Sequence, residues 1–434
     1  MEYAKTVSTD LISFIDHSPS PWHVVATVRE RLDAKQFIQL NEAEPWQLTP
    51  GDSYYVIRDD SSIIAFTLGQ QPLEQNGFRL IGAHTDSPGL RLKPKAPYQK
   101  GSLHQLGVEV YGGPILATFT DRDLSLAGRL SYWDADSKAI ESKLIRFKQP
   151  LVRLPNAAIH LNRDVNNKGL VLNKQTELPL VLGNFEAELP APEKFQQILA
   201  EKAQIEGPFS FELNVYDTQP GNFFGLDEEF IADSQLDNLA SCHAALLALT
   251  DEAAMQSGQT NICAFFDHEE VGSNSHKGAD GSFLSDLLER IAGARQLSDE
   301  NYKQALAQSI LISADMAHAY HPNYPKFYDG EHKLVVNQGP AIKINVNQRY
   351  TSDSVSQALF EHLCHRAEIP FQTYSHRGDL PCGSTIGPTT AARLGIRAMD
   401  IGNPMWAMHS IRESAGSLDH GYMIALLTTF FSQH

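Results

Sequence analysis

The sequence has few cysteines and no long apolar run. Only 4 of its 434 residues are cysteine, and they lie far apart, without a Cys-x-x-Cys pair. Neither a disulfide framework nor a thiolate zinc site is expected, and the spacing favours a reducing compartment. No apolar stretch approaches the roughly 20 residues of a membrane-spanning helix. Because Met1–Lys5 also lacks the apolar core of a signal peptide, we expect a cytoplasmic protein without membrane contact.

Basic residues are also scarce relative to acidic ones. The chain has 35 lysines and arginines against 52 acidic residues, for a formal charge of −17. Because no basic tract interrupts this background, we expect no binding to nucleic acid or to an anionic membrane.

The sequence contains no Gly-x-Ser-x-Gly elbow, no Gly-x-x-x-x-Gly-Lys loop and no His-Glu-x-x-His helix. These absences exclude three common kinds of catalytic site.

The length and the residue pattern predict two domains, one of them discontinuous. Residues 5–45 have a helical pattern that Pro19–Pro21 interrupts, and residues 53–83 have the pattern of strands. Short alternating segments and turns dominate residues 96–230, apart from a helical stretch near Glu193–Ala203. We therefore predict an α/β domain of mixed-sheet type at residues 1–95 and 231–434, with an inserted β-rich module at residues 96–230.

Several predicted strands end in side chains that bind metal ions. Strands predicted at 78–83, 262–266 and 309–314 are followed by His84 with Asp86, by Glu269 with Glu270, and by Asp315. The crevice beyond the carboxyl ends of strands is where open α/β sheets bind ligands. Two adjacent glutamates repel each other unless a cation lies nearby, so Glu270 is a candidate ligand and Glu269 a candidate proton acceptor. Asp86 matches the carboxylate that fixes the tautomer of a metal-bound histidine.

Each candidate also has a structural explanation. Glu269 and Glu270 could form a solvated acidic loop, and His84 could lie in a turn. Asp237 precedes a predicted helix and could be its N-cap. His409 could merely precede a capping box, because Ser410 and Glu413 have that spacing.

Taken together, the candidates are sufficient for two metal ions. We expect His84, Asp237 and Asp315 to bind one ion, and Asp237, Glu270 and His409 to bind the other. Each ion then has three protein ligands and an open position, as in catalytic zinc sites. Mixed histidine and carboxylate ligands suit two Zn²⁺ per subunit, with Mn²⁺ or Co²⁺ as substitutes. The ions would also offset a group of carboxylates that is otherwise costly to bury.

At this point the sequence resembles a known family, the M18 metallo-aminopeptidases, also called the aspartyl aminopeptidase family. Five blocks support the resemblance in order along the chain: His84–Gly89, Asp233–Leu239, Asp267–Ser273, Ser313–Ala319 and Met408–Glu413. The resemblance implies a dinuclear zinc aminopeptidase core that removes one residue from the free N-terminus of a peptide. It also implies that Glu269 is the general base for a metal-bridging hydroxide, and that Asp86 supports the first histidine.

The resemblance makes further predictions about assembly and substrate. It implies that the β-rich module forms dimers, which build a tetrahedral dodecamer. His160 would reach the active site of a neighbouring subunit, and Lys343 would pair with an N-terminal Asp or Glu of the substrate. His321 would line the same pocket. Without the family, His160 would be explained as an ordinary strand histidine, and Lys343 as an edge residue whose ammonium extends to solvent.

Three other functions fit parts of the pattern. The chain could be an aminopeptidase that prefers neutral N-terminal residues, or a dinuclear-metal deacylase of N-acyl amino acids. It could also be a self-assembling shell in which the metal is structural. Glu269 argues against the shell because it binds no metal in the proposed site, and the Lys343 block argues against the deacylase.

Overall fold

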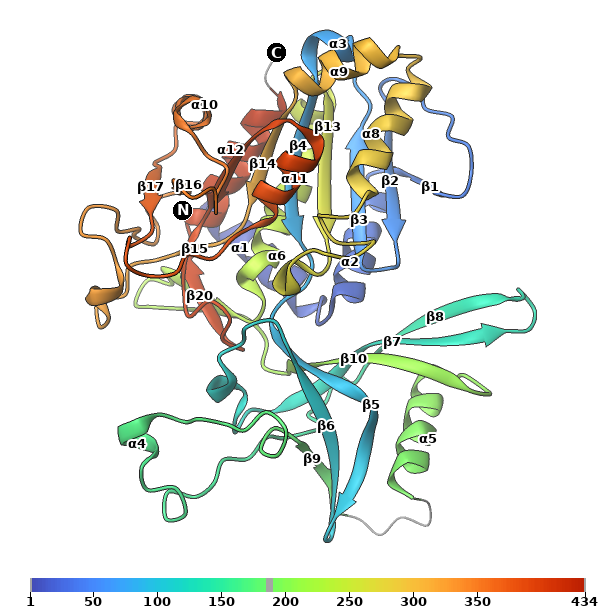
Figure 1. The fold of residues 1–434 in the computed structure, drawn as a ribbon, viewed down its shortest axis with the longest axis vertical. Coiled ribbons are helices and arrows are strands. Elements are labelled where there is room, and N and C mark those ends of the chain that lie inside the picture. The colour runs from blue at the N-terminus through green and yellow to red at the C-terminus, as the bar shows by residue number, and fades with distance from the viewer. Residues whose placement is uncertain (1, 185–189, 433–434) are drawn as a thin grey trace.

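A nine-stranded mixed sheet forms the centre of the larger part of the molecule (Figure 1). The computed structural model describes residues 2–184 and 190–432. In sheet order the strands are β1 (Ile38–Leu40), β2 (Ser53–Arg58), β3 (Ser62–Thr67), β13 (Thr260–Phe266), β4 (Phe78–His84), β14 (Ile310–Ala314), β18 (Arg397–Gly402), β16 (Ala341–Ile344) and β17 (Gln372–Ser375).

Helices cover both faces of this sheet, so its central strands are apolar on both sides. On β4, Leu80 packs into one core and its neighbour Ile81 into the other, because successive side chains of a strand point to opposite faces. Residues of α1 (Glu2–Asp16), α2 (Pro21–Ala34), α6 (Leu236–Leu249), α7 (Glu252–Met255), α10 (Ser354–Arg366) and α12 (Asp419–Ser432) pack into the core with Ile81. Residues of α3 (Leu73–Asn76), α8 (Phe283–Ala294), α9 (Asp299–Gln308) and α11 (Ile386–Leu394) pack into the core with Leu80.

The strand directions bring the predicted ligands to one edge of the sheet. Strand β4 pairs in parallel with β13 on one side and with β14 on the other. Their carboxyl ends therefore lie next to one another. Residue His84 ends β4, Asp315 follows β14, and the short 3-10 helix η2 (Glu269–Val271) follows β13.

Two smaller sheets complete the fold. A five-stranded sheet contains, in order, β11 (Asn222–Phe224), β12 (Phe230–Asp233), β20 (Glu413–Gly416), β19 (Pro404–Trp406) and β15 (Ala317–His318). A six-stranded antiparallel sheet contains, in order, β8 (Ala139–Arg146), β7 (Leu124–Asp134), β10 (Phe209–Asp217), β5 (Gly89–Lys100), β6 (Leu103–Tyr111) and β9 (Leu180–Gly183). We call the part built on this second sheet the β-rich module. It also contains η1 (Leu116–Phe119), α4 (Val165–Lys168) and α5 (Ala191–Ala203), and it lies below the α/β part in Figure 1.

The predicted α/β class with mixed sheets is confirmed, but some elements differ from the expectation. The helical pattern predicted over residues 5–45 ends at Ala34, and Ile38–Leu40 forms strand β1 beside β2. Three residues are too few for the strand period to be visible in a sequence. The longer helices α9, α11 and α12 were not predicted, nor were the short helices α3, α4 and α7. Among the described residues, no helix is both long and apolar enough to cross a membrane.

Truncation of a central strand residue should destabilise the fold. Leu80 is fully buried, so we expect Leu80→Ala to lower the free energy of unfolding by about 2–5 kcal/mol through lost contacts and a residual cavity. The matched control is Val355→Ala on α10, where the side chain is 56% exposed and the change should stay below about 0.5 kcal/mol. Urea denaturation measures both, and equal midpoints would contradict the expectation.

Candidate metal centre

The structure brings the five predicted metal ligands together from five separate segments. His84, Glu270 and Asp315 come from the carboxyl ends of neighbouring strands, as described above. Asp237 lies in the first turn of α6, where its backbone is non-helical and its peptide bond to Asn238 is cis. His409 lies in the loop between β19 and β20 with a positive φ of 68°.

The ligand atoms form two groups that share Asp237. Nε2 of His84 lies 3.5 Å from Oδ1 of Asp237 and 3.9 Å from Oδ1 of Asp315. Nε2 of His409 lies 3.4 Å from Oδ2 of Asp237 and 3.4 Å from Oε1 of Glu270. Two ligand atoms that bind one zinc ion tetrahedrally at about 2.1 Å are about 3.4 Å apart. Each oxygen of Asp237 thus faces a different histidine, at the separation that a shared ion would give.

The bonding of Asp237 supports a metal ion rather than a helix cap. Its Oδ1 is buried and, within the described part of the chain, has no hydrogen-bond partner. Such an acceptor is costly to bury unless a donor or a cation satisfies it. The ligand atoms of each group lie within 4.8 Å of one another, as the binding of one ion requires. The residues present therefore fit the metal.

Backbone carbonyls and carboxylates fix the orientation of the two histidines. Nδ1 of His84 lies 3.0 Å from the backbone carbonyl of Asp86 and 3.5 Å from its carboxylate. Nδ1 of His409 lies 3.1 Å from the carbonyl of Gly113 in the β-rich module. When Nδ1–H donates to these acceptors, Nε2 is left free to bind a metal ion, which is the usual arrangement for a ligating histidine.

The carboxylate of Asp86 mainly holds the turn that contains the two glutamates. Its Oδ1 accepts from the backbone N–H of Glu269 and its Oδ2 from that of Glu270, each at 3.1 Å. The hydroxyl of Tyr111, on β6, also donates to Oδ2 at 2.7 Å. Asp86 is fully buried, so these three donors replace water around its charge. The contact to His84 is thus only one of the functions of Asp86.

Glu413 is a supporting residue that the sequence reasoning missed. It is 2% exposed, and its Oε2 accepts from the backbone N–H of Asp237 while its Oε1 accepts from that of His409. One carboxylate therefore fixes the backbone of two predicted ligands. Glu413 lies in β20, so Ser410 and Glu413 do not form a capping box. Its position four residues after His409 is the only signal in the sequence that could have indicated this role.

Burial and neighbouring charges change the proton affinities of the cluster. Burial raises the pKa of Glu269 to about 8, and the carboxylates of Asp315, Asp86 and Asp237 add to the effect. Burial alone would lower the pKa of His409, but Asp237 and Glu270 outweigh it and raise the pKa to about 10. Burial also raises the pKa of Glu270. Without metal ions, these groups keep protons that they would lose in water at the same pH.

The three predicted substrate-binding residues lie in different surroundings. Lys343 is 2% exposed on β16, which pairs with β18 and β17, so it is not an edge residue with a solvated ammonium. Its Nζ donates to the carbonyl of Met316 at 2.8 Å and lies 3.8 Å from Asp315. His321 lines a pocket together with His318 and with Met408, which directly precedes His409 in the chain. His160 is exposed in the segment between β8 and α4 and is not part of the cluster in this subunit.

Histidine and carboxylate side chains gathered in this way, in two groups that share Asp237 and a third of His84, Glu269 and Glu270, are typical of a metal-dependent hydrolase. The sequence profile described as aminopeptidase I zinc metalloprotease (M18) matches residues 14–431. The chain belongs to the M18 family, and it is therefore a zinc metalloprotease and an aminopeptidase.

Relatives and solved structures agree with this membership. The probable M18 family aminopeptidase 2 of Ectopseudomonas mendocina is 47% identical over 428 residues, and that of Stutzerimonas stutzeri is 48% identical; each alignment covers 97% of both chains. In the cryo-EM structure of the Ape4 and Nbr1 complex, the matching chain has a TM-score of 0.93 and 38% identity, with 99% of this chain and 86% of that chain covered. The S. cerevisiae mApe1 dodecamer matches at a TM-score of 0.85 and 28% identity, with 99% and 97% covered.

Zinc binding should release protons from this cluster. Because the pKa of His409 is raised to about 10, the ion has to displace a proton that this side chain holds at neutral pH, and burial raises the pKa of Glu270 as well. We expect the apparent zinc affinity to increase from pH 6 to pH 9, by about tenfold per pH unit for each proton released.

Calorimetric titration of chelator-treated protein, in buffers that differ in ionisation enthalpy, counts the released protons. Asp237→Asn is the control, because it removes the shared charge and should abolish tight binding of both ions. An affinity that does not change with pH would contradict the assignment.

Proposed function

We propose that this aminopeptidase uses two metal ions per subunit to remove N-terminal Asp or Glu residues from peptides. The observation that supports it best is the position of Asp237 between two histidine–carboxylate groups, with Glu269 beside them. His84, Asp237 and Asp315 would hold one ion, and Asp237, Glu270 and His409 the other. When bound, such ions polarise the scissile carbonyl and lower the pKa of water.

Proton transfer is the role that we assign to Glu269. Its carboxylate is largely buried beside the candidate ligands, where burial raises its pKa to about 8 in the absence of metal ions. Cations bound beside it would lower that pKa, so that the carboxylate is ionised and able to take a proton near neutral pH. Glu269 would accept a proton from the attacking water and donate it to the leaving amine. Asp86 helps to keep the Glu269 carboxylate in place, because Oδ1 of Asp86 accepts a hydrogen bond from the backbone N–H of Glu269.

The preference for an acidic residue is inferred from Lys343 and from the pocket that contains His318, whose pKa is lowered by burial and also by the charge of Lys343. The pocket is lined by His318, Ala319, His321, Phe327, Tyr328, Tyr374, His376, Leu380, Pro381, Met405, Trp406, Ala407 and Met408. None of these lining residues is acidic, although the chain as a whole has a charge of −17. Within the described part of the chain, the only carboxylate paired with Lys343 is that of Asp315, whose charge a metal ion would offset. Lys343 would then attract a substrate carboxylate.

We further propose self-association through the β-rich module, into dimers and a tetrahedral dodecamer. The S. cerevisiae mApe1 structure is a dodecamer. In this chain, Trp133 and Ile140 are 62% and 65% exposed on the β7–β8 hairpin, at the edge of the six-stranded sheet. The exposed position of His160 suits contact with a neighbouring active site.

A reducing, cytoplasmic location is consistent with the four cysteines, which are all free.

Glu269→Gln tests the catalytic proposal. We expect kcat to fall by about 10²–10⁴-fold, since an amide cannot accept the proton, while zinc content and oligomeric state remain those of the parent. Peptide hydrolysis, metal analysis and size-exclusion chromatography measure the three properties. Unchanged hydrolysis would overturn the role of Glu269, and loss of assembly together with activity would favour a structural metal.

Lys343→Ala tests the substrate preference. We expect kcat/KM for peptides with N-terminal Asp or Glu to fall by about 10²-fold, because the lost ion pair leaves the substrate carboxylate without a buried partner. Peptides with neutral N-terminal residues should change by less than about threefold. Lys303→Ala is the control, since this lysine is exposed on the distant helix α9.

A panel of N-terminal residues, measured with chelator and with zinc added back, gives the specificity of the parent protein. Equal or faster hydrolysis of neutral residues would replace the acidic preference with a neutral one. Cleavage of N-acetylated substrates in preference to free amines would identify a deacylase instead.

A further inference from the structure

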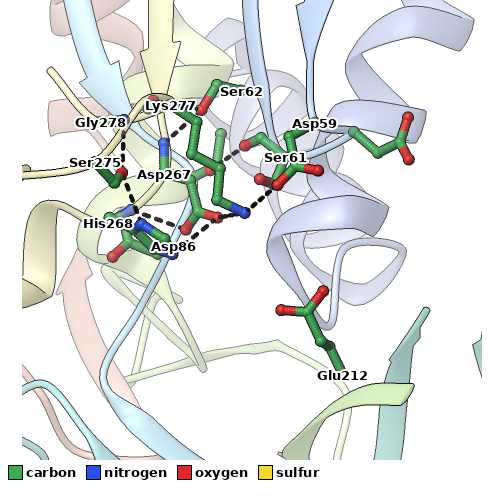
Figure 2. A network of polar contacts seen from close by, with 12 residues as sticks. Asp59, Ser61, Ser62, Asp86, Glu212, Asp267, His268, Ser275, Lys277 and Gly278 are labelled. Atoms are coloured by element: carbon green, nitrogen blue, oxygen red, sulfur yellow. Dashed lines mark hydrogen bonds and ion pairs between the residues drawn. The ribbon is translucent and has the colours of Figure 1, made fainter. Parts of the chain in front are cut away.

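A buried lysine lies behind the turn of Glu269 and Glu270, and the proposed reaction does not use it. Lys277 is only 4% exposed, and its Nζ lies 2.8 Å from Oδ2 of Asp59 and 3.1 Å from Oδ2 of Asp267 (Figure 2). Nζ also lies 5.9 Å from the ring centroid of Trp22. A buried ammonium is costly unless it is paired, so the two carboxylates fix its position.

On one side of Lys277, the contacts lead directly to the proposed general base. Asp267 is fully buried, and its Oδ1 accepts from the backbone N–H of His268 at 2.8 Å. Its own N–H donates to Oγ of Ser62, which in turn donates to the carbonyl of Lys277. His268 has a left-handed φ of 68° and directly precedes Glu269. The position of Asp267 therefore determines the direction in which the chain enters this turn.

On the other side of Lys277, the contacts cross into the β-rich module. Nη1 of Arg129, on β7, lies 3.1 Å from Oδ1 of Asp59, and Nη2 of Arg129 lies 2.8 Å from Oε2 of Glu212 on β10. The charges therefore alternate in sign from Glu212 through Arg129, Asp59 and Lys277 to Asp267. Figure 2 shows Lys277 between Asp59 and Asp267, with Glu212 apart from all three at the lower right.

We propose that Lys277 is a positioning residue for Glu269, and that Arg129 makes this positioning depend on the placement of the β-rich module. The proposal rests on the function proposed above for Glu269. Asp59 pairs with both Arg129 and Lys277. A displacement of Arg129 therefore changes the electrostatic attraction that Asp59 exerts on Lys277, and also the space available to Lys277. Lys277 then shifts against Asp267, and the turn of Glu269 moves with it. Contacts that place the module would thus influence catalysis without touching the substrate.

Substitution of Lys277 tests the first half of this proposal. We expect Lys277→Met to lower kcat by about 10–100-fold, as a small misplacement of a catalytic group does, with KM and zinc content within about twofold of the parent. Lys277→Arg keeps the charge and should recover most of kcat. An equal loss in both variants, or a loss that appears in zinc content instead of kcat, would overturn the positioning role.

Arg129→Met tests the second half, and its matched control is Arg153→Met. Arg153 pairs with Asp123 inside the module at 2.6 Å and has no contact with Lys277 or Asp59. We expect Arg129→Met to lower kcat by about 5–10-fold and Arg153→Met to leave it within twofold. Since Arg129 acts through Lys277, the double variant Arg129→Met/Lys277→Met should be no slower than Lys277→Met alone. The coupling would be overturned if the losses of kcat in the two single variants multiply in the double variant. It would also be overturned if Arg129→Met and Arg153→Met have the same kcat.

Two measurements keep the outcomes distinct. The parent protein is first assayed on the peptide panel, and a parent without peptidase activity would contradict the proposed function rather than the coupling. If Lys277→Met does not fold, Lys277→Arg and the comparison of the two arginine variants decide the result. Zinc content is measured for every variant, so that a lost ion is not mistaken for a misplaced glutamate.

Discussion

The structure depends on the burial of several carboxylates in one small volume. Asp86, Asp237 and Glu413 are all buried within or beside the cluster, and Glu269 and Glu270 adjoin it. Charges of one sign repel at these distances and cannot be buried without compensation. Backbone N–H groups satisfy Asp86 and Glu413, whereas Asp237 faces two histidines and has one oxygen to which no described residue donates a hydrogen bond. Metal ions would complete the compensation, which explains how a fold can concentrate acidic groups at the end of its most buried strands.

The β-rich module is part of this arrangement and not merely attached to it. Tyr111, at the end of β6, donates to Asp86, and the carbonyl of Gly113 lies next to His409. Farther along the module, Arg129 bonds Asp59 of the α/β part. The two parts of the molecule therefore meet at the groups that orient the proposed catalytic residues. Placement of the module and geometry of the centre are physically linked.

Sequence patterns predicted those parts of the structure that have local causes. A buried strand followed by polar residues is visible in the sequence, and His84 and Asp315 were found in this way. The supporting contacts were not visible, because they join distant segments: Glu413 bonds Asp237 across 176 positions, and Lys277 bonds Asp59 across 218. Helix α12 was missed because it is apolar on most of its surface and has little amphipathic period. Tertiary packing alone brings Glu413 to Asp237 and Lys277 to Asp59.

The two halves of the candidate centre differ in their access to solvent. The side chain of His84 is 2% exposed at the end of an interior strand, whereas that of His409 is 30% exposed in a loop. Opening a loop requires less free energy than opening a central strand. An ion bound by His409 would therefore exchange with the surrounding medium faster than one bound by His84. If two ions bind, the ion on the strand side would therefore have the longer residence time.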